Sequence, residues 1–393
     1  MFGYIGSDVS GPVNSIRPMQ GNRVLRILFV GDSSDLPPDM ADYIDDLDGQ
    51  LQVVADGNSA IAAVATLEFD VVVAAPALPD ITPATLLGQI RTLRPATSRI
   101  ALIAGEHSQR TPPARIIGVA HRFLPTPLAP EVLLEAVSSL EELRDLLDDA
   151  RLRSAIGRID KLPSPPHLYL SLMHALEEDE DSDASDIAKL ISGDPAIAAK
   201  VLQLCNSAFF SNGRAITDLR GAVTRLGIST LRDLVLASEV FSVQSLSGAE
   251  RQALQQRALV ASKLAAKMLP QSSAELGATA ALLADIGLLL PGVRNARSEP
   301  AGDDDERPAH TEAGGYLLGL WGLPMPIIEA VAFQMQPQRS STRSFWITGA
   351  VHVATALANG SPVDEAYLAK VGVLGKLDDW RELADELLGR VAA

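Results

Sequence analysis

Cysteine, aromatic side chains and long apolar runs are all scarce in this chain of 393 residues. The single cysteine, Cys205, cannot form an internal disulfide, so we expect a reducing compartment and a cytoplasmic protein. Residues 1–22 lack the apolar segment of a secretory signal and are expected to form a disordered N-terminal extension. The longest apolar stretch, residues 278–293, is interrupted by Asp285 and is shorter than the roughly 20 residues of a membrane span. We therefore expect no membrane contact.

Basic side chains are also scarce relative to acidic ones. The chain has 33 Lys and Arg against 49 Asp and Glu, which gives a formal net charge of −16. We find no local basic patch to offset this charge, which repels phosphate backbones, so a nucleic-acid partner is not expected. With 47 % apolar and 21 % charged residues the composition is that of a globular protein, and the length allows two or three domains.

Short apolar segments alternate with helical segments in the first third of the chain. Four of them are typical of buried strands, at residues 24–30, 51–55, 70–75 and 99–104, and a weaker fifth follows at 121–124. Ala and Leu recur at helical spacing at residues 58–67, 84–93 and 130–143. Strands that alternate with helices predict a doubly wound α/β domain with a five-stranded parallel sheet over residues 23–140.

This order of elements, with an acid after the first strand and the sequence Phe-Leu-Pro-Thr-Pro-Leu at 123–128, resembles the receiver domain of bacterial response regulators. The resemblance implies functional positions after the strands: two acids that hold a divalent cation, an Asp that accepts phosphate, a Ser or Thr, and a Lys. In this chain those positions are Gly31 and Asp32, Ala75, Ile103 and Thr126. Only Asp32 keeps the expected residue type.

The substituted positions predict a pseudo-receiver domain that cannot be phosphorylated. Ala75 has no carboxylate to form an aspartyl phosphate, and Asp80 in the following turn is the less favoured alternative acceptor. A lone acid after a strand, such as Asp32, is more often a helix cap than a metal ligand. We therefore expect this domain to serve docking or dimerisation.

Residues 141–158 are expected to connect this domain to the rest of the chain. Apolar residues recur at helical spacing from residue 130 to 155, which is compatible with one long helix that exposes its acids to water. Two interpretations remain for this connector. It is a semi-rigid linker packed on either domain, which is the favoured interpretation, or a stalk for a homodimer.

From residue 159 to residue 393 strand signals nearly vanish, and the pattern predicts an all-α helical bundle. The expected helices lie at residues 168–176, 185–193, 195–205, 218–226, 229–241, 248–269, 274–290, 310–321, 326–333 and 346–359. Residues 294–307 are rich in Pro, Gly and acids and are expected to form a mobile loop.

Three residue pairs on consecutive helical segments resemble the signature of the HDOD family. They are Asp194-Pro195, Asn206-Ser207 and Leu226-Gly227. Each pair is interpreted first as structural, because Asp-Pro starts a helix, Asn-Ser bonds loop backbone and Gly suits a helix C-terminus. The resemblance implies an HDOD domain over residues 159–393.

HDOD domains are similar to the HD superfamily of phosphohydrolases, in which His and His-Asp residues hold metals that activate water. The corresponding positions here, called the HD positions below, are Arg257, Ala284, Asp285, His310, Gln334 (followed by Met335) and Thr355. Only Asp285 and His310 keep a ligand side chain, so we expect no metal, no cofactor and no catalytic residue. An ion pair between Asp285 and Arg257 is a hypothesis from this alignment. His352 is a weak substitute for a ligand at Thr355.

Since both halves lack their expected chemistry, the favoured function is a non-catalytic signalling adaptor that binds other signalling proteins. The resemblance implies a bacterial, response-regulator-like protein of a two-component system, with homodimerisation through the receiver or the connector left open. Two alternatives remain: a metal-dependent HD-type phosphodiesterase of cyclic dinucleotides, and a nucleotide sensor without turnover. In the sensor, Arg257, Lys263 and Lys267 would contact phosphate.

Overall fold

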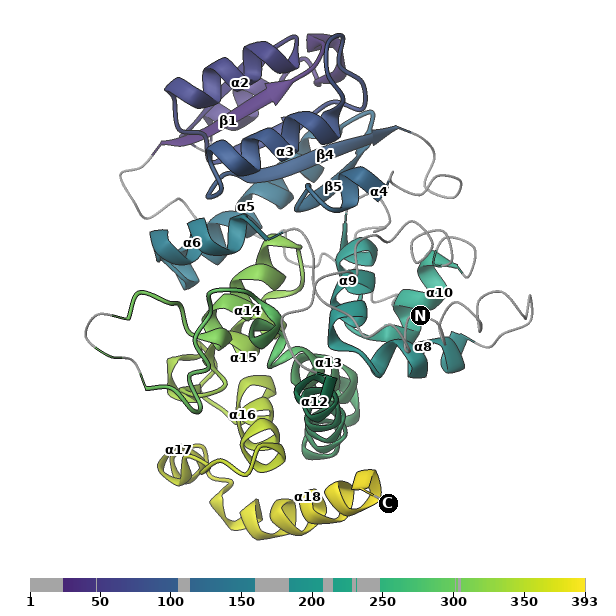
Figure 1. The fold of residues 1–393 in the computed structure, drawn as a ribbon, viewed down its shortest axis with the longest axis vertical. Helices are drawn as coiled ribbons and strands as arrows, with labels where there is room; N and C mark the ends of the chain where they lie inside the picture. The colour runs from purple at the N-terminus through teal and green to yellow at the C-terminus, as the bar shows by residue number, and fades with distance from the viewer. Residues whose placement is uncertain are drawn as a thin grey trace, which may run out of the picture.

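The computed structural model of the protein describes residues 24–46, 48–104, 114–159, 184–207, 215–227, 231, 248–300, 302 and 305–392. The expected extension at residues 1–22 and the expected helix at 168–176 lie outside these residues, as does most of the expected helix at 229–241. The described part of the chain forms an α/β half and a helical half that are stacked along the longest axis (Figure 1).

Five parallel strands form the sheet of the N-terminal half, in the order β2-β1-β3-β4-β5. The strands are β1 (Leu25–Val30), β2 (Gly49–Val54), β3 (Val71–Ala74), β4 (Ser98–Ala104) and β5 (Arg122–Thr126). The central strand β3 is buried along its whole length, whereas β2 at the edge is partly exposed. Burial on both faces explains why the sequence of β3 is continuously apolar. The prediction of a five-stranded parallel sheet is confirmed.

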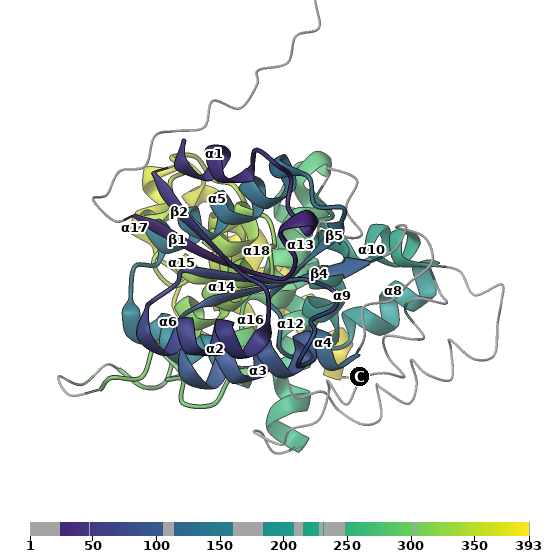
Figure 2. The same cartoon turned by 90° about the horizontal axis from the view of Figure 1, so that it is seen from above.

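Helices cover both faces of this sheet (Figure 2). On one side lie α1 (Met40–Asp45) and α5 (Pro130–Leu146), and on the other lie α2 (Gly57–Thr66), α3 (Pro83–Leu93) and the short α4 (Ala114–Ile117). Capping residues fix the helix starts, since the Asp56 side chain accepts from the backbone of α2 and Thr82 does the same for α3. The sheet and its helices therefore form a three-layer α/β domain.

The connector is two helices, which corrects the expectation of one long helix. Helix α5 ends at Leu146, and α6 (Ala150–Gly157) begins after a short break. The carboxylate of Asp149 accepts hydrogen bonds from the backbone N–H of Arg151 at 2.7 Å and of Leu152 at 3.3 Å. Such an N-cap starts a new helix with its own direction, although the apolar spacing continues through the break.

The helical half contains ten described helices and short 3-10 turns. The helices are α8 (Ala184–Ser192), α9 (Pro195–Asn206), α10 (Leu219–Leu226), α12 (Gly248–Met268), α13 (Gln271–Leu283), α14 (His310–Leu320), α15 (Met325–Phe333), α16 (Ile347–Ala358), α17 (Glu365–Lys370) and α18 (Leu377–Ala392). The expected helix at 274–290 is shorter than predicted, because α13 ends at Leu283 and a 3-10 turn, η3 (Ile286–Leu289), follows. The prediction of an all-α half is confirmed, but the last two helices were not predicted.

One stretch, Gln271–Leu289, is long and apolar enough to cross a membrane by length and composition. In this fold 61 % of it is buried inside the protein, where α13 packs against α12, α15 and α16. Its apolar character is therefore accounted for by the helical core.

The two halves share one continuous apolar core. Helix α14 packs against α5 and α6, and α9 lies under the β5 edge of the sheet (Figure 1). Polar contacts cross the same boundary: Gln203 of α9 donates to the carbonyl of His121 at 2.9 Å, and Lys200 to that of Ile117 at 3.3 Å. The apolar side of the connector, including Leu152 and Ile156, is buried within the chain.

Candidate functional site

The resemblance to receiver domains implies a phosphorylation site at the carboxyl ends of the strands in the N-terminal half. Ala75, at the position of the phosphate acceptor, is fully buried, and a Cβ added to Gly31 would lie 2.4 Å from the Cβ of Ala75. Ile103 is also buried, at 5 % exposure. Small and apolar side chains thus fill the region in which a receiver needs carboxylates.

The two acids near these strand ends are used as helix caps. Exposed Asp32 accepts a bond from the backbone N–H of Ser34 at 2.9 Å and caps the 3-10 turn η1 (Ser33–Asp35), and this bond lowers the pKa of Asp32. Asp80 accepts from Gly57 at 2.9 Å and from Asn58 at 2.8 Å, at the start of α2. The bond from Gly57 lowers the pKa of Asp80 most. Both carboxylates are therefore engaged by backbone.

The HDOD signature residues all hold backbone in place. Asp194 caps α9, with Pro195 in its first turn, by accepting from Ala196 at 2.7 Å. Its other oxygen accepts from Gln255 of α12 at 3.3 Å.

At the other end of α9, Asn206 exchanges two hydrogen bonds with the backbone of Ile216, at 2.7 and 2.8 Å, and Ser207 donates to the carbonyl of Leu204 at 2.7 Å. Buried Leu226 ends α10, and Gly227 has a φ of 74° that favours glycine. These side chains connect and terminate helices.

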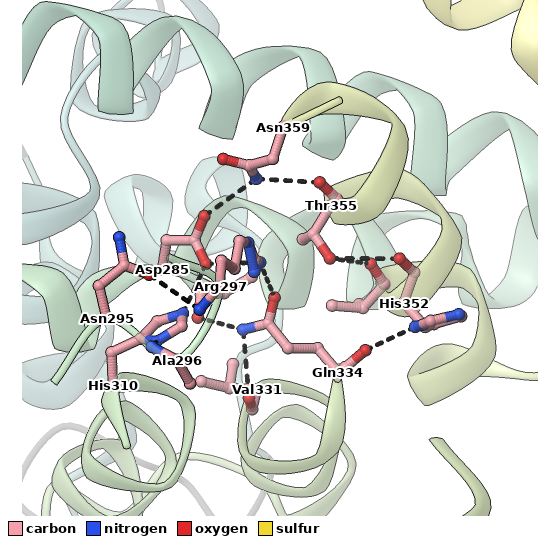
Figure 3. A network of polar contacts seen from close by, with 12 residues as sticks. Asp285, Asn295, Ala296, Arg297, His310, Val331, Gln334, His352, Thr355 and Asn359 are labelled. Carbon is pink, nitrogen blue, oxygen red and sulfur yellow. Dashed lines mark hydrogen bonds and ion pairs between the residues drawn. The ribbon is translucent and has the colours of Figure 1, made fainter. Parts of the chain in front are cut away.

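Three of the HD positions meet at one buried place, at the ends of different helices (Figure 3). Asp285 follows α13, His310 is the first residue of α14, and Gln334 directly follows α15. All three side chains are nearly inaccessible to water. The alignment therefore located a real cluster, although its members lie far apart in the sequence.

The other HD positions contribute nothing to the centre of this cluster. Ala284 offers only its backbone carbonyl, which accepts from the Gln334 amide. The hydroxyl of Thr355 donates to the carbonyl of Val351 in its own helix at 2.8 Å. Arg257 lies on α12, and its Nε is buried without a hydrogen-bond partner among the described residues.

An arginine that the sequence analysis missed occupies the centre of the cluster. Nη2 of Arg297 lies 2.8 Å from Oδ1 of Asp285 and also donates to Oε1 of Gln334. Asn359, at the end of α16, donates to the second carboxylate oxygen at 3.3 Å. We call Asp285, Arg297, His310, Gln334 and Asn359 the Arg297 site. The hypothesis of an ion pair between Asp285 and Arg257 was wrong, because the cation comes from the loop after η3.

The charge of Arg297 determines the protonation of its partner. Burial opposes ionisation of Asp285, but the guanidinium of Arg297, the nearby His310 ring and the bond from Asn359 outweigh it and hold the pKa of Asp285 at about 2. The carboxylate is therefore ionised at neutral pH and is neutralised from within the chain.

The imidazole of His310 presents a proton to this site. Its Nδ1 accepts a hydrogen bond from the backbone N–H of Ala296 at 3.1 Å. A neutral ring that accepts at Nδ1 carries its hydrogen on Nε2, and Nε2 lies 3.4 Å from the carboxylate of Asp285. A protonated nitrogen cannot ligate a metal, so the loop residue before Arg297 also fixes His310 in a non-ligating form.

These residues do not fit the divalent metal of the HD superfamily. A catalytic metal needs about three protein donors, and among the HD positions only Asp285 and His310 carry a side chain that can ligate a metal. Asp285 faces the guanidinium of Arg297, and His310 presents an N–H. His352 is no substitute, since its Nδ1 bonds to the carbonyl of Gln334 at 2.7 Å and its Nε2 accepts from Asp364 at 2.9 Å. The described residues contain no cluster of three or more potential metal ligands.

The basic residues proposed to contact a nucleotide do not converge. Lys263 and Lys267 of α12 are exposed, whereas Arg257 is partly buried. Six residues separate Arg257 from Lys263, which is about 240° around an α-helix, so the two side chains leave the helix in different directions.

Comparison with known proteins finds one family match and one relative of similar sequence. Residues 162–300 match the HDOD domain family. An uncharacterized protein of Treponema pallidum is 29 % identical over 204 residues, which is 46 % of this chain and 39 % of that protein. This chain therefore aligns with about two fifths of the length of that curated relative.

Two solved structures are also similar. The MmoQ response regulator of Methylococcus capsulatus is 22 % identical, with a TM-score of 0.44, and the match covers 60 % of this chain and 98 % of that chain. The receiver domain of an HD domain-containing protein from Pseudomonas fluorescens is 28 % identical, with a TM-score of 0.27, over 30 % of this chain and 88 % of that chain. The chain is therefore a five-stranded parallel α/β domain followed by a helical region in which residues 162–300 match the HDOD domain family.

Proposed function

We propose that this protein is a non-catalytic signalling adaptor whose phosphorylation-blind receiver-like domain and HDOD domain bind other signalling proteins. The observation that carries the proposal is the guanidinium of Arg297, which contacts Asp285 and Gln334 at positions where the HD resemblance implies metal ligands. Hydrolysis of the HD type needs a metal to activate water. Because the guanidinium of Arg297 already occupies Asp285 and Gln334, these positions do not offer a set of ligands for a divalent metal ion.

The other half supports the same function. Buried Ala75 offers no carboxylate for phosphate, and the acids nearby cap helices. A domain that keeps its sheet and helices without the phosphorylation residues is suited to binding proteins through its surface. We place the protein in the bacterial cytoplasm as a response-regulator-like component, without nucleic-acid or membrane partners, in keeping with its net charge of −16.

One surface available for such contacts is formed by α1 and the edge strand β2. Helix α5 lies beside α1 on the same face of the sheet, but α14 packs against α5. Tyr43 of α1 and Val53 of β2 are each 41 % exposed, and β2 is an edge strand of the sheet. We propose this surface for a signalling partner or for a homodimer.

The test is quantitative capture of partners from the native cytoplasm with the full chain as bait. We expect a signalling protein to be enriched by the wild type and by Leu93→Asp, and to be lost with Tyr43→Asp. Leu93 is a matched control, because it is 47 % exposed on the other face of the sheet. If no protein is enriched and a cyclic dinucleotide binds in a calorimetric titration, the result would favour the nucleotide-sensor alternative instead.

A further inference from the structure

Helix α14 lies between the Arg297 site and the receiver-like domain (Figure 1). An arginine from another element lies near each end of this helix. Arg297 pairs with Asp285, which His310 at the N-terminal end also faces, and Arg122 of β5 donates to carbonyls at the C-terminal end. About nine residues separate the two ends, which is roughly 14 Å along an α-helix.

At the N-terminal end, the loop of Arg297 is attached to the first residue of α14. The backbone N–H of His310 donates to the carbonyl of Arg294 at 2.9 Å, and the N–H of Ala296 donates to the ring of His310. The N–H of Arg294 donates in turn to the carbonyl of Pro308 at 2.9 Å. Movement of Arg297 away from Asp285 therefore pulls on the first turn of α14.

At the C-terminal end, the buried guanidinium of Arg122 connects α14 to the receiver-like domain. It donates to the carbonyls of Gly319 at 2.8 Å and Leu320 at 3.2 Å, and to that of Ala136 in α5 at 2.8 Å. The last carbonyls of a helix lack partners within the helix and carry partial negative charge, so a cation there stabilises the end. Burial lowers the pKa of Arg122 to about 10, which leaves it charged at neutral pH.

The packing around α14 leaves no room for one end to move alone. A Cβ on Gly319 would lie 2.4 Å from the Leu143 side chain of α5, and a Cβ on Gly287 would lie 1.8 Å from the carbonyl oxygen of His310. Closely packed elements transmit a displacement because they cannot absorb it.

We propose that α14 couples the Arg297 site to the receiver-like domain. A partner that draws the Arg297 loop out of its site shifts α14 and weakens the Arg122 contacts, and a partner on the receiver-like domain acts in the reverse direction. The biological use of this coupling rests on the proposed adaptor function, but the coupling itself is a property of the chain. Coupling free energies are reciprocal, so each end must report on the other.

Hydrogen exchange of the full chain tests the proposal. Replacing Arg297 with Met is expected to raise the exchange rates of amides in β5 and α5 by about fivefold beyond any change in β2 at the far edge of the sheet, which corresponds to about 1 kcal/mol. Arg307→Met is the matched control, because Arg307 lies in the same loop but is half exposed and pairs with Asp305. We expect this control to leave β5 and α5 within about twofold of the wild type, since distant sites are ordinarily independent.

The reverse experiment changes the receiver end. Arg122→Met is expected to raise the exchange rates of residues 294–300, whereas Arg94→Met is not, because Arg94 donates to the Val64 carbonyl on the surface of the same domain. If Arg297→Met fails to fold, Arg297→Lys keeps the charge. It should raise the exchange rates of the same amides, but by a smaller factor.

Exchange that rises only within residues 285–334 after Arg297→Met, or only within the receiver-like domain after Arg122→Met, would overturn the coupling. That result would leave the adaptor function untouched, since partner capture by the wild type does not depend on it. Conversely, coupled exchange without any captured partner would refute the adaptor function alone.

Discussion

The Arg297 site predicts a large and specific loss of stability when its cation is removed. Replacing Arg297 with Met leaves the carboxylate of Asp285, 7 % exposed, without its main counter-charge. The pKa of about 2, against an ordinary 3.8, corresponds to about 2 kcal/mol of stabilisation. Because removal of one partner of a buried pair leaves the other uncompensated, the full loss should be about 3 to 5 kcal/mol.

Urea unfolding of the full chain at neutral pH measures this loss. Arg307→Met, on the exposed part of the same loop, should leave the urea midpoint close to that of the wild type. The double variant Arg297→Met with Asp285→Asn should recover part of the loss, because it removes the unpaired charge. An unchanged midpoint for Arg297→Met, or no recovery in the double variant, would refute this account of the site.

The pH dependence of the same pair has a defined sign. The folded state depresses the pKa of Asp285, so the stabilisation is fully present above pH about 4 and is lost as the pH falls towards about 2. Arg297→Met should flatten this part of the pH profile, which is a result that a purely steric effect of the substitution would not produce.

Three further predictions concern other parts of the chain. Ala75→Asp should lower stability by about 1 to 3 kcal/mol, because it places a carboxylate in a fully buried position, and incubation with acetyl phosphate should leave it unlabelled. The stability of the wild type should fall as the pH drops below 6.5, since burial, and then the charge of Arg99, holds the pKa of His121 well below that value while the unfolded chain takes up the proton. His121→Gln should make this decline shallower in denaturation curves at several pH values. Gly157→Ala should destabilise the connector by more than about 1 kcal/mol, because the added Cβ would lie 1.8 Å from the carbonyl oxygen of Pro95, and an unchanged melting temperature would contradict that packing.

Much of the fold was predictable because its signals are local. A buried strand such as Val71–Ala74 shows as a continuous apolar run, and the helices of the second half show as apolar spacing. The break in the connector also has a local signal, since Asp149 is a good N-cap, but uninterrupted leucine spacing concealed it. The last helix, Leu377–Ala392, was missed although Leu377, Trp380 and Ala384 recur at helical spacing.

The Arg297 site was predictable only in part. The alignment found Asp285 and His310 because they keep the residue types of the superfamily. It could not find Arg297, because the loop of residues 294–307 has no periodicity and no motif that indicates where an arginine side chain points. The loop prediction was based on composition, and the function of the loop depends on three contacts, to Asp285, His310 and Gln334, that only the fold brings together.

The most direct test of the central claim is to measure metal content and phosphodiester hydrolysis on the same sample. The purified full chain would be incubated with Mn²⁺ or Fe²⁺, its bound metal counted by mass spectrometry, and its activity assayed on bis(p-nitrophenyl) phosphate and on a cyclic dinucleotide. The account predicts substoichiometric metal and no hydrolysis above that of Asp285→Asn, because Arg297 already neutralises the carboxylate. One or two tightly bound metals per chain, with hydrolysis that Asp285→Asn abolishes, would contradict it.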